Sequence, residues 1–212
     1  MPGLIIEPHY IPNLQYFSKF LLSKSIIIDD TSLFRKQSYR NRANILSSNG
    51  VLSLIVPVCK GRSKTVFKDI RIDNSVYWQK NHWNSIVSAY NKSAYFQFYK
   101  YLFEWFYGKH YNFLIEFNLD IIKTISTILS LKTDIILFSE YRGEMSKLDD
   151  MRNNIDPKTR YHKKDDLFTQ IKYSQVFSDR FEFIPDLSMI DLIFNHGPDA
   201  AAILQNSVIR PF

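Results

Sequence analysis

Three short apolar runs, each followed by polar or acidic residues, constrain the fold of this chain more than any other sequence feature. They are Leu4–Ile6 before Glu7-Pro8, Ser25–Ile28 before Asp29-Asp30, and Asp134–Ser139 before Glu140. Continuous, β-branched runs of this length are typical of strands buried on both faces, as in parallel sheets covered by helices. Ligands in open α/β sheets collect beyond the carboxyl ends of strands, so the residues after each run are the first candidates for a site.

The segments between these runs predict helices and a β-hairpin. Apolar residues at helical spacing predict helices over Asn13–Leu22, from Asn74-Ser75 through Tyr90, over Tyr95–Phe106 and Phe113–Leu131, and from Ser188 to a stop at Gly197-Pro198. Asn49-Gly50, between Ser38–Leu46 and Val51–Val58, predicts a tight hairpin turn with a positive-φ pair. We also predict a strand over Phe67–Ile72 and a long irregular surface loop over Arg142–Lys172. The expected fold is α/β, a mixed sheet with an antiparallel hairpin, flanked by helices.

Composition limits the class of protein. The chain has 212 residues, 45% of them hydrophobic and 23% charged, which predicts one globular domain over residues 1–212. A lone Cys59 cannot form an internal disulfide, the N-terminus lacks a secretory pattern, and no apolar run approaches the ~20 residues of a membrane helix. We therefore expect a soluble, cytoplasmic protein.

Charge is distributed unevenly along the chain. Residues 1–109 carry 15 Lys and Arg against 6 Asp and Glu, whereas the remainder carries 12 against 15. The positive half is expected to attract an anion, for which a nucleotide-sugar, a lipid-linked pyrophosphate, an anionic membrane face and nucleic acid are the candidates. No nucleic-acid recognition motif accompanies the charge, so we expect no nucleic-acid partner. No phosphate-binding loop, dinucleotide fingerprint or zinc-ligand spacing is present, so neither a cofactor nor a metal is predicted.

Four acid–base candidates follow from these placements. His9 lies in the polar stretch after the first run, and Asp29 and Asp30 end the second. Adjacent side chains on an extended chain point to opposite sides, so at most one of the two aspartates faces a site, and turn formation explains them equally well. His82 shares a helix face with Trp78 and Tyr90, where a hydrogen-bonded, half-buried histidine is the alternative.

Arg42 and Lys60 are the candidates for binding an anion. In Tyr39-Arg40-Asn41-Arg42, strand alternation predicts Tyr39 and Asn41 on one face and the two arginines on the other. The guanidinium of Arg42 matches phosphate or carboxylate in a bidentate fork, and Lys60 would add a point charge at the same rim. The alternative is a solvated basic edge that prevents aggregation.

Taken together, the segments make this chain resemble the WbqC-like family, which is found in bacterial O-antigen and other surface-polysaccharide gene clusters. The matching pieces are Glu7-Pro8-His9-Tyr10-Ile11-Pro12, Tyr16-Phe17, the Asp29-Asp30 region, Tyr39-Arg40-Asn41-Arg42, Ile55-Val56-Pro57-Val58 with Lys60-Gly61, Trp78, His82-Trp83 with Ser85-Ile86, Tyr90–Phe96, Tyr173–Phe177 and Phe183–Asn195. Longer relatives carry a segment with tyrosine and glycine before the glutamine motif, whereas residues 144–172 here contain no glycine. Any role that this segment has in the longer relatives is therefore not assigned to residues 144–172 here.

The resemblance implies a transferase of surface-polysaccharide assembly that moves an aminoacyl, glycyl or other acyl group onto an activated sugar. His9 or one of the two aspartates would be the base, and Arg42 with Lys60 would hold a nucleotide-sugar or lipid-linked substrate. The motifs add candidate substrate-binding residues: Glu7, Tyr10, Tyr39, Asn41, Trp78, Tyr90, Gln175, Asp191 and Asn195. Asp191 has capping-box spacing to Ser188, so a helix cap is its alternative. The rival function is a non-catalytic module that docks on a glycosyltransferase or, as a peripheral contact, on the inner membrane face.

Overall fold

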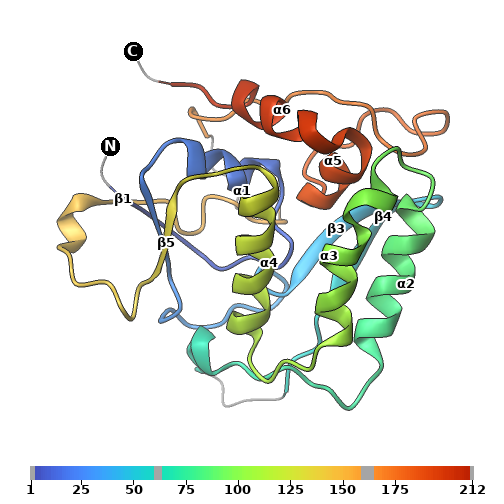
Figure 1. The fold of residues 1–212 in the computed structure, drawn as a ribbon. Helices are drawn as coiled ribbons and strands as arrows, with labels where there is room; N and C mark the ends of the chain where they lie inside the picture. The colour runs from blue at the N-terminus through green and yellow to red at the C-terminus, as the bar shows by residue number, and fades with distance from the viewer. Residues whose placement is uncertain (1–2, 60–63, 159–164, 211–212) are drawn as a thin grey trace.

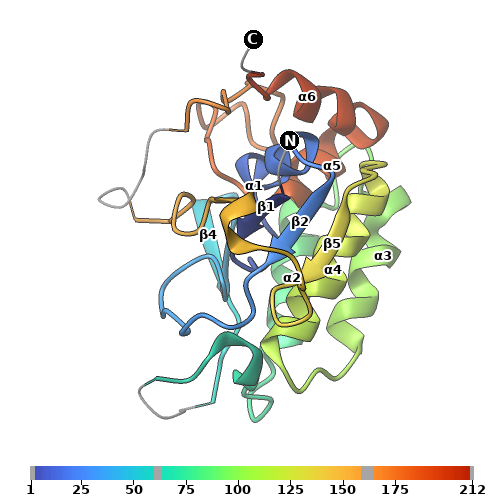
Figure 2. The ribbon, with the colours of Figure 1, turned by 90° about the vertical axis from the view of Figure 1, so that its left-hand side faces the viewer.

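The three apolar runs form strands, as predicted, and they lie side by side in one parallel sheet. Across the sheet the strands are β5 (Asp134–Leu137), β2 (Ser25–Ile28), β1 (Gly3–Ile6) and β6 (Leu148–Asp150) (Figure 2). Leu4 pairs with Ile26, and Ile26 pairs with Ile135, so the isoleucine-rich strands are in register. The isoleucines of β2 are fully buried. The computed structural model describes residues 3–59, 64–158 and 165–210.

The fourth strand, β6, comes from the segment that the sequence predicts to be an irregular loop. It pairs in parallel with β1, Gly3 opposite Leu148 and Ile5 opposite Asp150. Apart from a 3₁₀ turn over Met145–Lys147 and β6, the described part of Arg142–Lys172 has no helix or strand, which agrees with the prediction. Leu148-Asp149-Asp150 has no apolar run to reveal a strand, because β6 is a short edge strand with both aspartates exposed.

The predicted hairpin is present and forms a sheet of its own. Strands β3 (Arg42–Ser47) and β4 (Gly50–Ile55) pair antiparallel. Of the predicted positive-φ pair only Gly50 has a positive φ, 98°, so that part of the prediction is wrong. The turn is a two-residue connection, Ser48-Asn49, and Gly50 pairs with Ser47 at its base. The strand also begins at Arg42 rather than at Ser38, because residues 38–41 form turns, so the predicted alternation over Tyr39–Arg42 does not occur.

In the described part of the chain, six α-helices lie around the two sheets (Figure 1). They are α1 (Leu14–Ser18), α2 (Trp78–Tyr90), α3 (Phe96–Gly108), α4 (Leu114–Ile128), α5 (Met189–His196) and α6 (Ala200–Asn206). The predicted strand over Phe67–Ile72 is wrong, since Phe67–Asp69 form a 3₁₀ helix with Phe67 buried. Helix α2 starts at Trp78, later than its predicted cap at Asn74-Ser75, because Asp73 binds the backbone and hydroxyl of Ser75 in a separate turn.

Aromatic rings join the helices into one hydrophobic core. Phe194 of α5 packs against Tyr90 of α2 and against Phe96 and Phe103 of α3, with ring centroids 5.0–5.4 Å apart. Phe117 of α4 is fully buried in the same core. No helix in the described ranges has both the length and the apolar character that crossing a membrane requires.

We expect Gly50→Val to lower the free energy of unfolding by about 1 kcal/mol or more, because a β-branched residue resists positive φ. Space is not the reason, since a Cβ atom at Gly50 would meet no other atom within 4 Å. Gly108→Val is the matched control, because Gly108 is equally open and has no positive φ. Urea denaturation of the parent and both variants gives the comparison. Equal stability of Gly50→Val and the parent would contradict this turn.

Candidate functional site

The candidate site lies where strands β1 and β6 end. The strands that follow β1 in the sequence, β2 and β5, lie on one side of it, and the last strand, β6, lies on the other side. The strand order therefore reverses between β1 and β6, which makes this boundary a topological switch point. The carboxyl end of β1 leads into Glu7-Pro8-His9, and that of β6 into Met151-Arg152-Asn153. The amide of Met151 donates to the carbonyl of Ile5 at 3.0 Å, which holds the two ends together.

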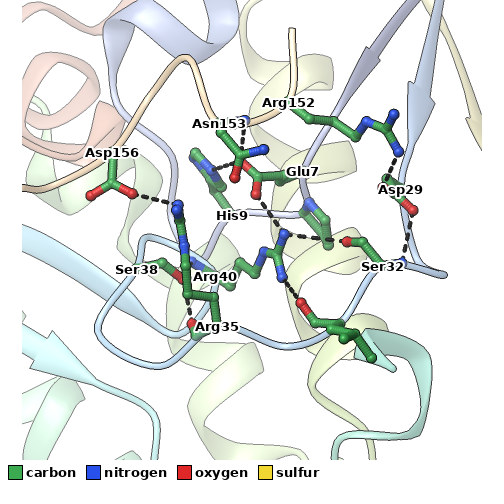
Figure 3. Close-up of polar contacts among 12 residues, drawn as sticks. Glu7, His9, Asp29, Ser32, Arg35, Ser38, Arg40, Arg152, Asn153 and Asp156 are labelled. Atoms are coloured by element: carbon green, nitrogen blue, oxygen red, sulfur yellow. Dashed lines mark hydrogen bonds and ion pairs between the residues drawn. The ribbon is translucent and has the colours of Figure 1, made fainter. Parts of the chain in front are cut away.

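Glu7 is the centre of a buried polar cluster (Figure 3). Its Oε1 accepts a hydrogen bond from Arg40 Nη2 at 2.5 Å, and its Oε2 accepts one from the amide of Asn153 at 2.9 Å. Both charged side chains are at most 5% exposed. Arg40 also donates to the carbonyl of Leu33, and to Ser32 Oγ at 3.2 Å. The ion pair therefore ties the end of β1 to the segment between Ser32 and Asn41.

The surroundings keep Glu7 ionised. Burial alone would raise the pKa of the carboxyl group, but the interaction with His9, the positive charge of Arg40 and the amide of Asn153 together lower the pKa to about 2. Glu7 is therefore a carboxylate at every pH at which the protein is expected to function.

His9 lies beside this carboxylate as a neutral ring. Its Nε2 is 3.9 Å from Glu7 Oε2, and its ring packs between Tyr16 and Tyr39, with centroids 4.8 and 5.5 Å away. Burial lowers the pKa of His9; Glu7 opposes that shift and Arg40 adds to it. A neutral imidazole next to a fixed negative charge has the composition of a general base with an orienting carboxylate.

Hydrogen bonds from three other elements fix the backbone around His9. Tyr16 Oη donates to the carbonyl of Glu7 at 3.0 Å, and Asn118 of α4 donates to the carbonyls of Pro8 at 3.3 Å and Arg40 at 2.8 Å. Ile11 has a φ of 37°, a left-handed conformation that a β-branched residue adopts only when its surroundings impose it. The stretch between Glu7 and Pro12 is thus held in one strained shape.

Asp29 and Asp30 point to different partners, as expected of neighbours on an extended chain. Asp29 accepts hydrogen bonds from Thr31 and Ser32 through Oδ1 and from Arg152 through Oδ2 at 2.9 Å. Although burial opposes the shift, the hydrogen bond from Arg152 and those from the turn lower the pKa of Asp29. Asp30 accepts from the amide and hydroxyl of Ser139, at 2.9 and 2.7 Å. These bonds favour turn and loop fixation for both aspartates.

Three arginines surround the cluster. Arg35 binds Asp156, and Arg152 binds Asp29 (Figure 3). Arg152 also binds Asp150. The side chains of Arg35 and Arg152 are 37% and 28% exposed, so the cluster reaches solvent through them.

Arg42, the third arginine, is close enough to Tyr39 to act on its hydroxyl. Burial, followed by the charges of Asp186 and Asp156, raises the pKa of Tyr39, and Arg42 opposes the shift. Nε of Arg42 is buried without a hydrogen-bond partner. Lys60, its predicted companion, lies outside the described residues.

His82 belongs to a different network. Its Nδ1 is 2.9 Å from Tyr10 Oη, which also hydrogen-bonds Tyr107 Oη at 2.8 Å, and its ring packs edge-on against Trp78. Burial lowers the pKa of His82 to about 4. His82 is hydrogen-bonded, as in the alternative to catalysis that the sequence offers, but it is buried and not half-buried.

The remaining candidates other than Asp191 are each tied to the fold by a side-chain hydrogen bond. Trp78 donates to Asn74, Asn41 donates to the carbonyl of Val56, Tyr90 accepts from the amide of Leu46, Gln175 bonds both backbone groups of Ile184, and Asn195 donates to the carbonyl of Asp191. Ser188 precedes α5 but makes no side-chain cap, so the predicted capping box is wrong. Both carboxylate oxygens of Asp191 are buried without a hydrogen-bond partner.

Arg152, Asn153, Asp156 and Asn118 are members of the cluster or its support that the sequence did not indicate. The first three lie in the segment predicted to be a surface loop, where polar residues look like solvent-facing ones. Asn118 is a fully buried polar residue inside an apolar helix. A polar residue in an apolar helix needs a hydrogen-bond partner, and this pattern could have marked Asn118 in the sequence. Within the described residues, no three histidine, cysteine or acidic side chains gather as a metal site would require.

Comparison with known proteins places the cluster in a family. A model of the WbqC-like protein family matches residues 7–164. That stretch contains Glu7, His9, Arg40 and Asn153. The chain is also similar to the uncharacterized protein Rv1507c of Mycobacterium tuberculosis, at 24% identity over 226 residues, which cover 95% of this chain and 96% of that protein. No solved structure matches the chain.

We expect Glu7→Gln to lower the free energy of unfolding by about 3–5 kcal/mol, because it leaves the guanidinium of Arg40 buried opposite a neutral amide. The folded-state pKa of Glu7, about 2, is below its ordinary value of 4.5. Its ionisation therefore contributes stability that is full above pH 4.5 and is lost as the pH falls toward 2. The variant should lack that part of the pH dependence.

Denaturant melts between these pH values measure both effects. Glu144→Gln is the control, because Glu144 makes an exposed ion pair with Lys147. Loss of that pair should change the free energy of unfolding only slightly. A Glu7→Gln protein as stable as the parent would contradict the central role of the ion pair.

Proposed function

The chain belongs to the WbqC-like protein family, and we propose that it is a transferase of surface-polysaccharide assembly that moves an aminoacyl or other acyl group onto an activated sugar. The observation that carries this proposal is the neutral His9 beside the ionised Glu7 at the switch point of the sheet. A base of this kind serves a reaction in which a hydroxyl or amine must lose a proton as it attacks.

The proposed step is an acyl transfer from an activated donor such as a thioester. The oxygen or nitrogen of the sugar forms a bond to the acyl carbon, and the bond between that carbon and the donor's sulfur breaks. Nε2 of His9 faces Glu7, so Nδ1 is the atom that takes the proton of the attacking group. The imidazolium then returns this proton to the departing thiolate, and Glu7 stabilises the positive charge in between.

His9 is preferred to the aspartates because its Nε2 faces Glu7, which leaves Nδ1 as the basic atom of the neutral ring. Asp29 and Asp30 already accept hydrogen bonds at both carboxylate oxygens. In this proposal Arg40 positions Glu7 and does not touch the substrate.

Arg42 is proposed to bind the phosphates of the activated sugar. Its charge acts at Tyr39, whose ring is 5.5 Å from that of His9, so an anion held there would lie close to the base. Its Nε has no partner within the protein. A planar guanidinium offers two parallel donors to a phosphate, which an ammonium group does not.

We expect the parent protein to acylate a UDP-hexosamine when supplied with acetyl- or glycyl-thioesters of coenzyme A, as detected by mass spectrometry. His9→Gln should reduce the rate by about 10²–10⁴-fold, the usual contribution of a general base, without loss of folding. A His9→Gln protein as fast as the parent would exclude His9 as the base.

Binding of the UDP-hexosamine tests the role of Arg42. Arg42→Lys should weaken binding of the UDP-hexosamine by about ten-fold or more, measured by calorimetry, because one charge-assisted hydrogen bond is lost. Arg180→Lys is the control at an exposed arginine, and His9→Gln should bind as the parent does. Unchanged binding by Arg42→Lys would return Arg42 to the alternative of a solvated basic edge.

A second candidate function, docking on a partner, is favoured by the outer face of α3. Phe98, Tyr101 and Trp105 are 67%, 62% and 57% exposed there, an unusual set of aromatic residues to leave in water. If the parent neither acylates nor binds the sugar, while a Trp105→Ser variant no longer sediments with vesicles that the parent binds, docking replaces transfer as the proposed function.

A further inference from the structure

Asp191 is a buried charge site that the proposed reaction does not use. Its side chain is 0% exposed, and among the described residues no hydrogen bond of normal geometry reaches either carboxylate oxygen. Ser188 Oγ, one helical turn earlier, is also buried without a partner. Burying an unpaired carboxylate is costly, so such a group calls for a proton or for a cationic partner.

Polar side chains surround this carboxylate. Burial raises the pKa of Asp191 to about 6, and interactions with Tyr90, Tyr173 and Gln175 limit the shift. The three side chains lie close enough to the carboxylate to favour its ionised form, although no hydrogen bond to its two oxygens has normal geometry.

Tyr173 and Gln175 also form the wall of a groove. Gln175 lines a cavity of about 680 Å³ and an adjoining one of about 250 Å³, which Tyr173 lines as well. The larger cavity shares Ser48 and Ser88 with a third, of about 460 Å³, beside the hairpin. The three cavities thus adjoin one another from the hairpin to Tyr173 and Gln175, the two residues that interact with Asp191. The largest is within the range of ligand sites, roughly 300–1,000 Å³.

The lining of this groove indicates the chemistry of its ligand. The hairpin and α2 supply mainly hydroxyl and amide side chains, among them Ser48, Asn84, Ser88 and Asn91. Lys92 and Asp179 bring opposite charges to the middle cavity. Hydroxyl and amide groups both donate and accept, which suits the hydroxyls of a sugar, whereas a phosphate would need clustered cations.

We propose that this groove binds an amino sugar, whose hydroxyls contact the serine and asparagine side chains and whose ammonium group pairs with Asp191. The ammonium passes between Tyr173 and Gln175, whose side chains move to admit it. Its three donors then satisfy the two free carboxylate oxygens and Ser188 Oγ. The site shares no residue with the Glu7–His9 cluster, and its test needs no transferase activity.

The test is a binding titration of the full chain with glucosamine, glucose and N-acetylglucosamine, followed by NMR chemical shifts. The three sugars differ at one position, which carries an ammonium, a hydroxyl or a neutral amide. Glucosamine should bind about ten-fold or more tightly than the other two, because only it places a charge-assisted hydrogen bond on the carboxylate. Asp191→Asn should reduce glucosamine to the affinity of glucose.

Two further variants control this titration. Ser88→Trp, a change at an exposed helix position shared by two of the cavities, should block all three sugars while the protein stays folded. Glu182→Gln removes an exposed carboxylate at the smallest of these cavities and should leave the affinities for the three sugars unchanged. Equal affinity for glucosamine and glucose, binding that survives Asp191→Asn, or no binding of glucosamine by the folded parent would each overturn the proposal.

Discussion

The ion pair between Glu7 and Arg40 is the interaction on which the rest of this structure depends. It is buried, and it joins three segments that are far apart in the sequence: the end of β1, the turns before the hairpin, and the chain after β6 through Asn153. A buried pair of this kind is weak support for stability in itself, but either partner alone would be very costly. The pair therefore fixes how these segments meet more than how strongly the protein folds.

The same pair determines the electrostatics around His9. The interaction with His9 and the positive charge of Arg40 keep Glu7 ionised. Burial lowers the pKa of His9, and the charge of Arg40 adds to that shift, which Glu7 opposes. The strained Ile11 and the bonds from Asn118 and Tyr16 hold the ring in place. The stretch continues to Pro12 and Asn13, which contact Ser188 and Met189 at the start of α5. The two sites proposed here are thus connected by one short stretch of backbone.

The sequence predicts the strands that bury isoleucine, because continuous apolar runs have few other uses in a domain of this size. It also predicts that Glu7-Pro8-His9, Asp29-Asp30 and Ser139 follow strand ends, which the structure confirms. It misses β6 and the role of Arg152 and Asn153, because an edge strand of Leu148-Asp149-Asp150 is selected by pairing with β1 and not by its own composition. Arg40 was assigned to the wrong element for a similar reason: its position is decided by Glu7, 33 residues away. Tertiary ion pairs of this kind leave no periodic pattern in a sequence.

The protonation state of His9 tests most directly whether this histidine is a neutral base beside Glu7. An NMR titration of the His9 ring, assigned by comparison with His9→Gln, follows its protonation as the pH is lowered. We expect the pKa of His9 to lie below 6.5, the ordinary value of a histidine, so that the ring is neutral beside an ionised Glu7 at neutral pH. A pKa above 6.5 would show that the pull of Glu7 exceeds the effects of burial and of Arg40, and would contradict His9 as a neutral base.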